Sequence, residues 1–157
     1  MYHYEKSEFI PAKPEVVFTY ADDFRNFSSH MNKSSWMMGG GKMETQTDDG
    51  NGQKVGSHIK MEGKIFGMNL FLDEAIIIHE PPFKKAWKTV GYINLIVIDH
   101  YTLGFEIKPD KEGSVIRVYI DYQLPKTFKT YLAGVLLGNI YAQWCVSQMI
   151  DRVKSYF

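Results

Sequence analysis

Glu74 is a residue of this sequence whose surroundings suggest chemistry. It lies in the run MNLFLDEAIIIHE, residues 68–80, and alternates with Leu72 and Ile76, so strict alternation predicts that its side chain points into the interior. An ionised carboxylate is strongly disfavoured in an apolar interior unless it is paired or takes up a proton. Glu74 is therefore a candidate acid or base facing a ligand. The alternative is a local slip of register, or a structural pair with a tyrosine, arginine or lysine.

Asp99 poses the same question on the next apolar run, where it shares a phase with Val97 and Tyr101. If both carboxyl groups point inward, they could act as the acid and the base of a cyclase or dehydratase. A bulge between Tyr92 and Asp99 would instead turn Asp99 outward. Glu74 and Asp99 are thus the candidate catalytic residues, although sequence phase does not place them within reach of each other.

The run SSWMMGGGKMET, residues 34–45, has the glycines and the lysine of a phosphate-binding loop but not its spacing. The motif G-x-x-x-x-G-K-[ST] would need glycine in place of Trp36 and serine or threonine in place of Met43. A further strand is expected after it, where a phosphate loop requires a helix. We expect the glycines, Gly40 among them, to shape the rim or floor of an apolar cavity.

Other kinds of catalytic or metal site are not indicated. The five histidines are His3, His30, His58, His79 and His100. They show neither the helical spacing nor the clustering with cysteine that a zinc site prefers. The one cysteine, Cys145, falls on the apolar stripe of the last helix, where a buried inert thiol is expected. There is no G-x-S-x-G motif, and we expect no metal and no cofactor.

Composition narrows the class of protein. The chain has 157 residues, 45% of them hydrophobic, which indicates one globular domain over residues 1–157. Lys plus Arg and Asp plus Glu number 18 each, and this balance argues against a nucleic-acid partner. The first residues lack the basic head and apolar run of a signal peptide, so a cytoplasmic protein is expected.

Hydrophobic periodicity predicts the elements that position these side chains. A strand covers Tyr2–Ile10, a helix begins at Pro14, and a second short helix covers about 23–31. Six strands follow from Trp36 to Gln123. After Pro125 the apolar spacing changes to threes and fours, which predicts one long helix to the end of the chain.

Alternation also predicts which strand residues point inward. These are Val55, Ser57, Ile59 and Met61; Met68, Leu70, Leu72, Glu74, Ile76 and Ile78; Leu95, Val97, Asp99, Tyr101, Leu103, Phe105 and Ile107; and Ile116, Val118, Ile120 and Tyr122. A further strand is expected over Lys84–Tyr92. The single long helix has to cover the apolar face of the sheet, which predicts an α+β fold. A strongly curved sheet cannot touch one helix along its whole length, so a hollow is expected between them.

Three stretches carry a resemblance to a known family: IPAKPEVVFTYADDFRNFSSHM (10–31), GQKVGS (52–57) and EPPFKKAWKTVG (80–91). With the order of elements, they resemble the START-like helix-grip superfamily (SRPBCC), which includes polyketide cyclase/dehydrase and lipid-transport-like proteins. An uncharacterised bacterial branch is the most similar. The resemblance implies a helix-grip fold: a curved antiparallel sheet of about seven strands wrapped round a long C-terminal helix, with two short helices after the first strand. It also implies a cavity between sheet and helix that commonly holds an apolar ligand.

We therefore expect this chain to bind or carry a hydrophobic small molecule, such as a lipid, a quinone or a polyketide-like compound. The alternatives are a cyclase/dehydratase-type enzyme that uses cavity carboxylates, and an interaction module that docks through the C-terminal helix. The residues expected to contact the ligand are Trp36, Met38, Gly40, Met61, Leu72, Glu74, Trp87, Tyr101, Leu103, Ile120, Tyr122, Tyr141 and Trp144. Most are aromatic or methionine side chains, which offer adaptable apolar surface and a few hydroxyl groups.

The last helix is apolar on most of its sides. No charged residue occurs from Thr130 to Ile150, although Asn139 and other polar residues make a spanning helix a poor fit. Gly134 and Gly138 are expected to leave room beside the helix, or to permit close contact with a second molecule. Partners other than the apolar ligand are therefore a homodimer or a transient membrane contact.

Overall fold

The computed structural model describes residues 1–27, 43–65, 67–126 and 128–157, with no side-chain description for residues 65 and 128–130. The elements, in chain order, are β1 (Tyr2–Ile10), α1 (Pro14–Asp22), α2 (Phe24–Phe27), β2 (Met43–Thr47), β3 (His58–Ile65), β4 (Met68–Glu80), β5 (Lys84–Thr89), β6 (Tyr101–Asp110), β7 (Gly113–Tyr122) and α3 (Phe128–Tyr156). This order confirms the predicted sequence of one strand, two short helices, six strands and one long helix.

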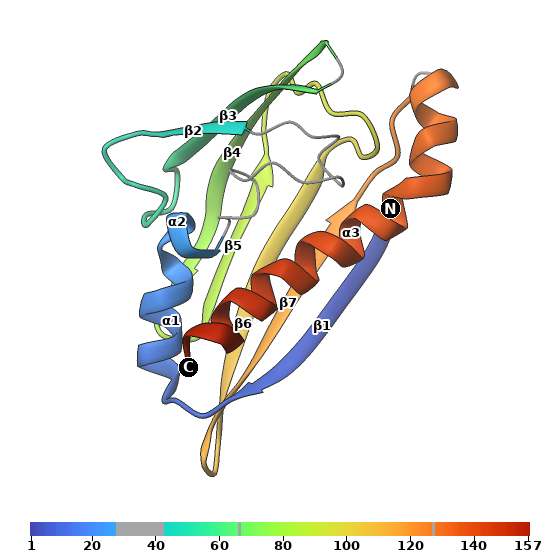
Figure 1. The fold of residues 1–157 in the computed structure, drawn as a ribbon. Helices are drawn as coiled ribbons and strands as arrows, with labels where there is room; N and C mark the ends of the chain where they lie inside the picture. The colour runs from blue at the N-terminus through green and yellow to red at the C-terminus, as the bar shows by residue number, and fades with distance from the viewer. Residues whose placement is uncertain (28–42, 66, 127) are drawn as a thin grey trace.

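The strands form one curved antiparallel sheet in the order β1-β7-β6-β5-β4-β3-β2. Helix α3 crosses the inner face of this sheet diagonally and packs against β1 and β7, while its C-terminal end lies beside α1 (Figure 1). Helices α1 and α2 cover the inner face at that end. The predicted α+β helix-grip architecture is confirmed.

Burial along the strands follows the predicted period of two over most of the sheet. On β7, Ile116, Val118, Ile120 and Tyr122 are buried and their neighbours are not. Residues opposite them in the core come from the second half of α3, where Ala142, Cys145, Val146, Met149, Ile150 and Val153 are buried. The apolar core therefore lies between the centre of the sheet and the C-terminal half of α3.

The alternation changes phase within β4. The register between β4 and β5 shifts between Ile76 and Ile78, which is a β-bulge with one extra residue on β4. Before the bulge, even-numbered residues such as Glu74 face the interior. Beyond it, His79 pairs with Lys85 of β5, and both side chains contact Asp22 of α1 on the inner face of the sheet. The bulge thus directs His79 inward, where strict alternation from Glu74 would direct it outward, and brings it beside Lys85, which alternates with the buried Trp87 and Thr89 on β5.

Four details of the predicted strands are wrong. Val55 lies in a turn just before Gly56 (φ 85°) and is exposed, because β3 begins only at His58. Met68 is also exposed, at the first position of β4. The strand predicted over Lys84–Tyr92 ends at Thr89, and the run predicted from Leu95 becomes a strand only at Tyr101. Residues 90–100 form the connection between β5 and β6, so period-two reasoning does not apply to them.

The prediction that Gly134 and Gly138 leave open space beside the helix is wrong. A Cβ atom on Gly134 would lie 2.8 Å from Pro125 Cδ and 3.0 Å from the carbonyl oxygen of Val97. On Gly138 it would lie 3.2 Å from the same carbonyl oxygen. These glycines let the 90–100 connection and the segment before α3 pack directly against the helix backbone.

The N-terminal half of α3 is exposed on its apolar side. Tyr131, Leu132, Val135, Leu136, Leu137 and Ile140 are each about half or more accessible to solvent. Among the helices as far as the structure describes them, none is long and apolar enough to cross a membrane. The homodimer and the transient membrane contact stay predictions.

Candidate functional site

Glu74 lies on β4, next to the central strand of the sheet, and points into the space between the sheet and α3. It is paired with Ile59 on β3 and with Thr89 on β5, so strands flank it on both sides. Only 3% of the residue is exposed. The sequence prediction that Glu74 faces the interior is therefore correct. Glu74 precedes the bulge on β4, so the regular alternation of the strand applies to it.

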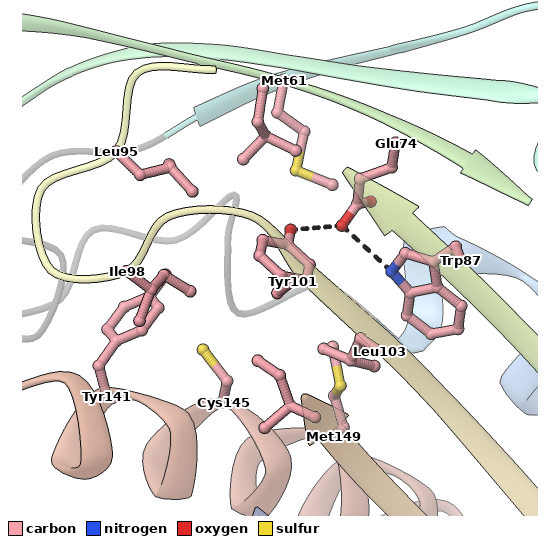
Figure 2. A pocket seen from close by; sticks show the side chains of 12 residues that line it. Met61, Glu74, Trp87, Leu95, Ile98, Tyr101, Leu103, Tyr141, Cys145 and Met149 are labelled. Carbon is pink, nitrogen blue, oxygen red and sulfur yellow. Dashed lines mark hydrogen bonds between the residues drawn. The ribbon is translucent and has the colours of Figure 1, made fainter. Parts of the chain in front are cut away.

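Two donors hold the Glu74 carboxyl group in place. The indole Nε1–H of Trp87 on β5 donates to Glu74 Oε1 over 3.1 Å. The hydroxyl of Tyr101, the first residue of β6, donates to the same oxygen (Figure 2). Three adjacent strands thus contribute one residue each to a buried hydrogen-bonded cluster, which we call the Glu74 cluster.

The Glu74 cluster forms the polar part of an otherwise apolar pocket. The lining residues are Met61, Leu72, Glu74, Trp87, Leu95, Ile98, Tyr101, Leu103, Ile120, Tyr141, Cys145 and Met149. The sheet supplies most of them, the 90–100 connection supplies Leu95 and Ile98, and α3 supplies the last three (Figure 2). The volume open to the centres of water-sized molecules is about 30 Å³. Since one such molecule needs about 10–15 Å³ by this measure, the pocket as it stands takes one or two waters.

Burial dominates the electrostatics of the pocket. It raises the pKa of the Glu74 carboxyl from its ordinary 4.5 to about 7, although the hydrogen bonds from Tyr101 and Trp87 act in the opposite direction. Burial, together with the neighbouring Glu74, raises the pKa of Tyr101 well above its ordinary value. Near neutral pH the phenol therefore keeps its proton, while Glu74 is divided between its neutral and ionised forms.

The wall of the pocket formed by α3 is less polar. Burial raises the pKa of the Cys145 thiol to about 12, even though a hydrogen bond with Tyr141 favours the thiolate. A thiol in this state is a poor nucleophile. The structure thus agrees with the sequence interpretation of Cys145 as a buried, unreactive residue.

Eight of the predicted ligand-contacting residues come together in this pocket: Met61, Leu72, Glu74, Trp87, Tyr101, Leu103, Ile120 and Tyr141. Tyr122 does not line it and instead stacks on Tyr2, with ring centroids 5.5 Å apart. Trp144 also lies outside the lining, against Tyr141. Trp36, Met38 and Gly40, with most of the glycine run, fall outside the described residues. For all thirteen residues, contact with a ligand stays a prediction.

The pairing of Glu74 with a second carboxylate is wrong. Asp99 lies in the 90–100 connection and does not line the pocket; its carboxylate contacts the ring of His100, with Oδ1 3.0 Å from Nδ1. The adjacent Ile98 takes the inward position. The backbone here is held by a hydrogen bond from the Asp99 amide to the Gln123 carbonyl, over 2.8 Å, and not by a regular ladder. Two carboxylates are therefore not available as an acid and a base in this pocket.

A second buried cluster, which the sequence interpretation missed, lies beside α1. Lys85 Nζ donates to Asp22 Oδ1 over 2.6 Å and to the Asp22 carbonyl over 2.7 Å, and its side chain is only 3% exposed. His79 Nε2 lies 3.1 Å from both carboxylate oxygens of Asp22. Burial lowers the pKa of Lys85, while Asp22 acts to raise it. This cluster ties the end of α1 to β4 and β5.

Metal binding finds no support in the part of the chain that the structure describes. Within residues 1–27, 43–65, 67–126 and 128–157, no three side chains of His, Cys, Asp or Glu lie close enough together to hold a metal ion.

No protein-family model and no curated protein matches the sequence. Solved structures do share the fold. The protein TTHA0849 from Thermus thermophilus is 15% identical with a TM-score of 0.68, and the match covers 98% of this chain and 94% of that one. A norcoclaurine synthase from Thalictrum flavum, solved with a transition-state analogue, is 13% identical with a TM-score of 0.65, over 99% and 92%. The di-domain ARO/CYC StfQ from the steffimycin biosynthetic pathway is 13% identical with a TM-score of 0.63, over 98% of this chain and 49% of StfQ.

These likenesses agree with the sheet order and the position of α3. The chain has the helix-grip fold, which these solved structures share. At these identities the likeness establishes the fold and not the activity.

Proposed function

We propose that this protein binds a hydrophobic small molecule in the pocket between the sheet and α3. The observation that carries this proposal is the composition of the pocket wall: apolar side chains surround one buried carboxyl group with two fixed donors. Ligand sites are typically apolar cavities with a few placed polar groups of this kind. Affinity would come from apolar burial, and orientation from the Glu74 cluster.

A ligand larger than a water molecule requires the pocket to open. Met61 on β3 and Met149 on α3 face each other across the pocket, and methionine side chains change rotamer at low cost (Figure 2). Leu95 and Ile98 belong to a connection rather than to a strand, so they too can shift without breaking a ladder. These four side chains form the adaptable part of the wall. A lipid, quinone or polyketide-like ligand is therefore proposed to enter by displacing them.

Structures with this fold give the proposal further support. One of them was solved with a transition-state analogue bound, and another belongs to a biosynthetic pathway. We extend from them only the idea that a protein with this fold can hold an organic ligand. The ligand of this chain is expected to be apolar over most of its surface, because the pocket offers few polar groups.

Native mass spectrometry of the purified protein, followed by extraction with organic solvent, tests this function. The expected result is a co-purifying apolar compound that leaves on extraction, and saturable enhancement of the fluorescence of anilinonaphthalene sulfonate (ANS) by the extracted protein. Absence of both a co-purifying compound and a saturable ANS site would remove the proposal.

A second candidate function is a cyclase- or dehydratase-type enzyme. The observation that favours it is the pKa of Glu74, about 7, which suits proton transfer near neutral pH. In this version Glu74 alone transfers the proton, and Tyr101 holds the Glu74 carboxyl group in position. Once a substrate is identified, Glu74→Gln should abolish turnover while ligand binding survives. Unchanged turnover in that variant would leave binding as the function.

A further inference from the structure

The two oxygens of the Glu74 carboxyl group have different surroundings. Trp87 Nε1–H and the Tyr101 hydroxyl both donate to Oε1. Among the residues that the structure describes, none donates a hydrogen bond to Oε2. The residue is 3% exposed, so water does not reach Oε2 freely from outside. A buried polar atom without a partner is unfavourable, so Oε2, which accepts from none of the described residues, is a point where a polar atom of a ligand would be stabilising.

The donors on Oε1 determine where the proton of a neutral Glu74 lies. An indole N–H can only donate, so Oε1 has to act as an acceptor towards Trp87. The Tyr101 hydroxyl donates to Oε1 as well, and an oxygen that accepts from two donors is favoured as the carbonyl oxygen, so the proton of the neutral acid is favoured on Oε2. An O–H group at this position is a hydrogen-bond donor on a residue that lines a pocket with apolar side chains such as Met61 and Leu103.

We propose, building on the function above, that Glu74 Oε2–H donates to an acceptor oxygen of the ligand, so that the pocket selects neutral apolar molecules carrying a carbonyl group. A plain hydrocarbon leaves Oε2 without a partner. An ammonium ion would need the ionised carboxylate, which burial disfavours. The raised pKa of Glu74 agrees with this geometry, since burial keeps the donor form populated up to about neutral pH. Of the ligand classes proposed above, quinones and polyketide-like compounds carry such a carbonyl group.

Three probes with one carbon skeleton separate these cases: acetophenone, ethylbenzene and 1-phenylethylamine. They present a carbonyl oxygen, no polar atom and an ammonium group, respectively. Binding is followed through the indole N–H resonance of Trp87, identified by its loss in Trp87→Phe, because this group contacts Glu74 directly. The titrations use wild-type protein and Met149→Ala, which enlarges the same pocket. At about pH 6, acetophenone should bind about tenfold more tightly than ethylbenzene.

Two variants test the role of the donor. Glu74→Gln can place its amide N–H₂ at the position of Oε2–H, so it should keep the preference for acetophenone. Glu74→Leu has no donor and should bind acetophenone and ethylbenzene equally. Asp99→Asn, a carboxylate-to-amide change outside the pocket, should behave like wild type.

Three other outcomes of the titrations would each contradict either the donor role of Glu74 or the proposed function. Equal affinity of wild-type protein for acetophenone and ethylbenzene overturns the donor and leaves the apolar pocket standing. Tightest binding of 1-phenylethylamine, lost in Glu74→Gln, also overturns it, because Oε2 would then be an anionic acceptor. Failure of all three probes to bind, in wild type and in Met149→Ala, removes the proposed function itself and this inference with it.

Discussion

The indole Nε1–H of Trp87 donates to the carboxyl group of Glu74 across the β4–β5 ladder, over 3.1 Å. The two residues are not opposite each other, since Glu74 pairs with Thr89 and Trp87 pairs with Ile76. They are diagonal neighbours on the same face of the sheet, a distance that a tryptophan side chain can bridge. Together with the hydrogen bond from Tyr101, this contact fixes the orientation of the carboxyl group in an otherwise apolar pocket.

The first prediction concerns pH and stability. The native state holds the proton of Glu74 up to about pH 7, whereas the unfolded chain releases it near 4.5. The unfolded state therefore binds fewer protons in this range, and the contribution of Glu74 to the free energy of unfolding falls as pH rises from 4.5 through 7, by about 3 kcal/mol in all.

Glu74→Gln should remove this dependence. Urea denaturation at about pH 5 and about pH 8.5 should show the variant gaining stability relative to wild type at the higher pH. Asp99→Asn, whose carboxylate is outside the pocket, is the control and should show no such gain. If the wild-type and Glu74→Gln stabilities change in parallel with pH, Glu74 does not carry a raised pKa.

The second prediction concerns the size of the pocket. Met149→Ala and Met43→Ala both remove a buried methionine side chain, and each should lower the free energy of unfolding by about 2–5 kcal/mol. Only Met149 lines the pocket. Isothermal titration calorimetry should therefore show tighter ethylbenzene binding in Met149→Ala and no change in Met43→Ala. An equal gain in both variants would mean that the probe simply fills whichever cavity is made.

The third prediction concerns the buried charges beside α1. Lys85→Met leaves the Asp22 carboxylate without its closest cation and should lower the free energy of unfolding by about 3–5 kcal/mol. Lys84→Met, at the next position and in a partly exposed pair with Glu106, should lower it by less than about 1 kcal/mol. Adding Asp22→Asn to Lys85→Met should recover part of the loss, because the pair is removed together. Additive losses in the double variant would show that the two groups are not coupled.

The fourth prediction concerns the contact between α3 and the 90–100 connection. Replacing glycine with alanine inside a helix normally stabilises it by about 1 kcal/mol. Gly134→Ala should instead be destabilising in thermal denaturation, because the new Cβ would lie 2.8 Å from Pro125 Cδ and 3.0 Å from the Val97 carbonyl oxygen. Asn139→Ala, on an exposed side of the same helix, should be neutral or slightly stabilising. A stabilised Gly134→Ala variant would mean that the connection moves away without loss.

Sequence reasoning found Glu74 because it lies on a regular strand, where a period of two is enough to assign a face. It failed for Asp99 because residues 90–100 belong to a connection between strands, although their apolar residues happen to alternate. Burial in this segment is set by contact with α3 and not by a ladder. Alternating composition alone does not distinguish the two situations.

The buried cluster of Asp22, His79 and Lys85 could not be predicted from the same pattern. The bulge between Ile76 and Ile78 reverses the phase of β4, and nothing in the local sequence marks it. The partner, Asp22, is 57 residues from His79 and belongs to a helix. Only the packing of α1 against the sheet brings these side chains together.

The glycines of α3 show a related limit of prediction from sequence. Spacing identified Gly134 and Gly138 as positions of special packing, and that much is correct. Whether such positions leave space or admit a neighbouring backbone depends on the segment that lies over them, which here contains Val97.

The central claim is that an apolar molecule binds among the side chains around Glu74, and the methionine methyl groups report on it most directly. We expect titration with acetophenone, followed by methyl NMR, to shift the signals of Met61 and Met149 saturably, since both line the pocket. The signal of Met43, which is equally buried but lies outside the pocket, should stay in place. Unchanged Met61 and Met149 signals at saturating probe, in wild type and in a Leu95→Ala variant with a widened wall, would contradict the account.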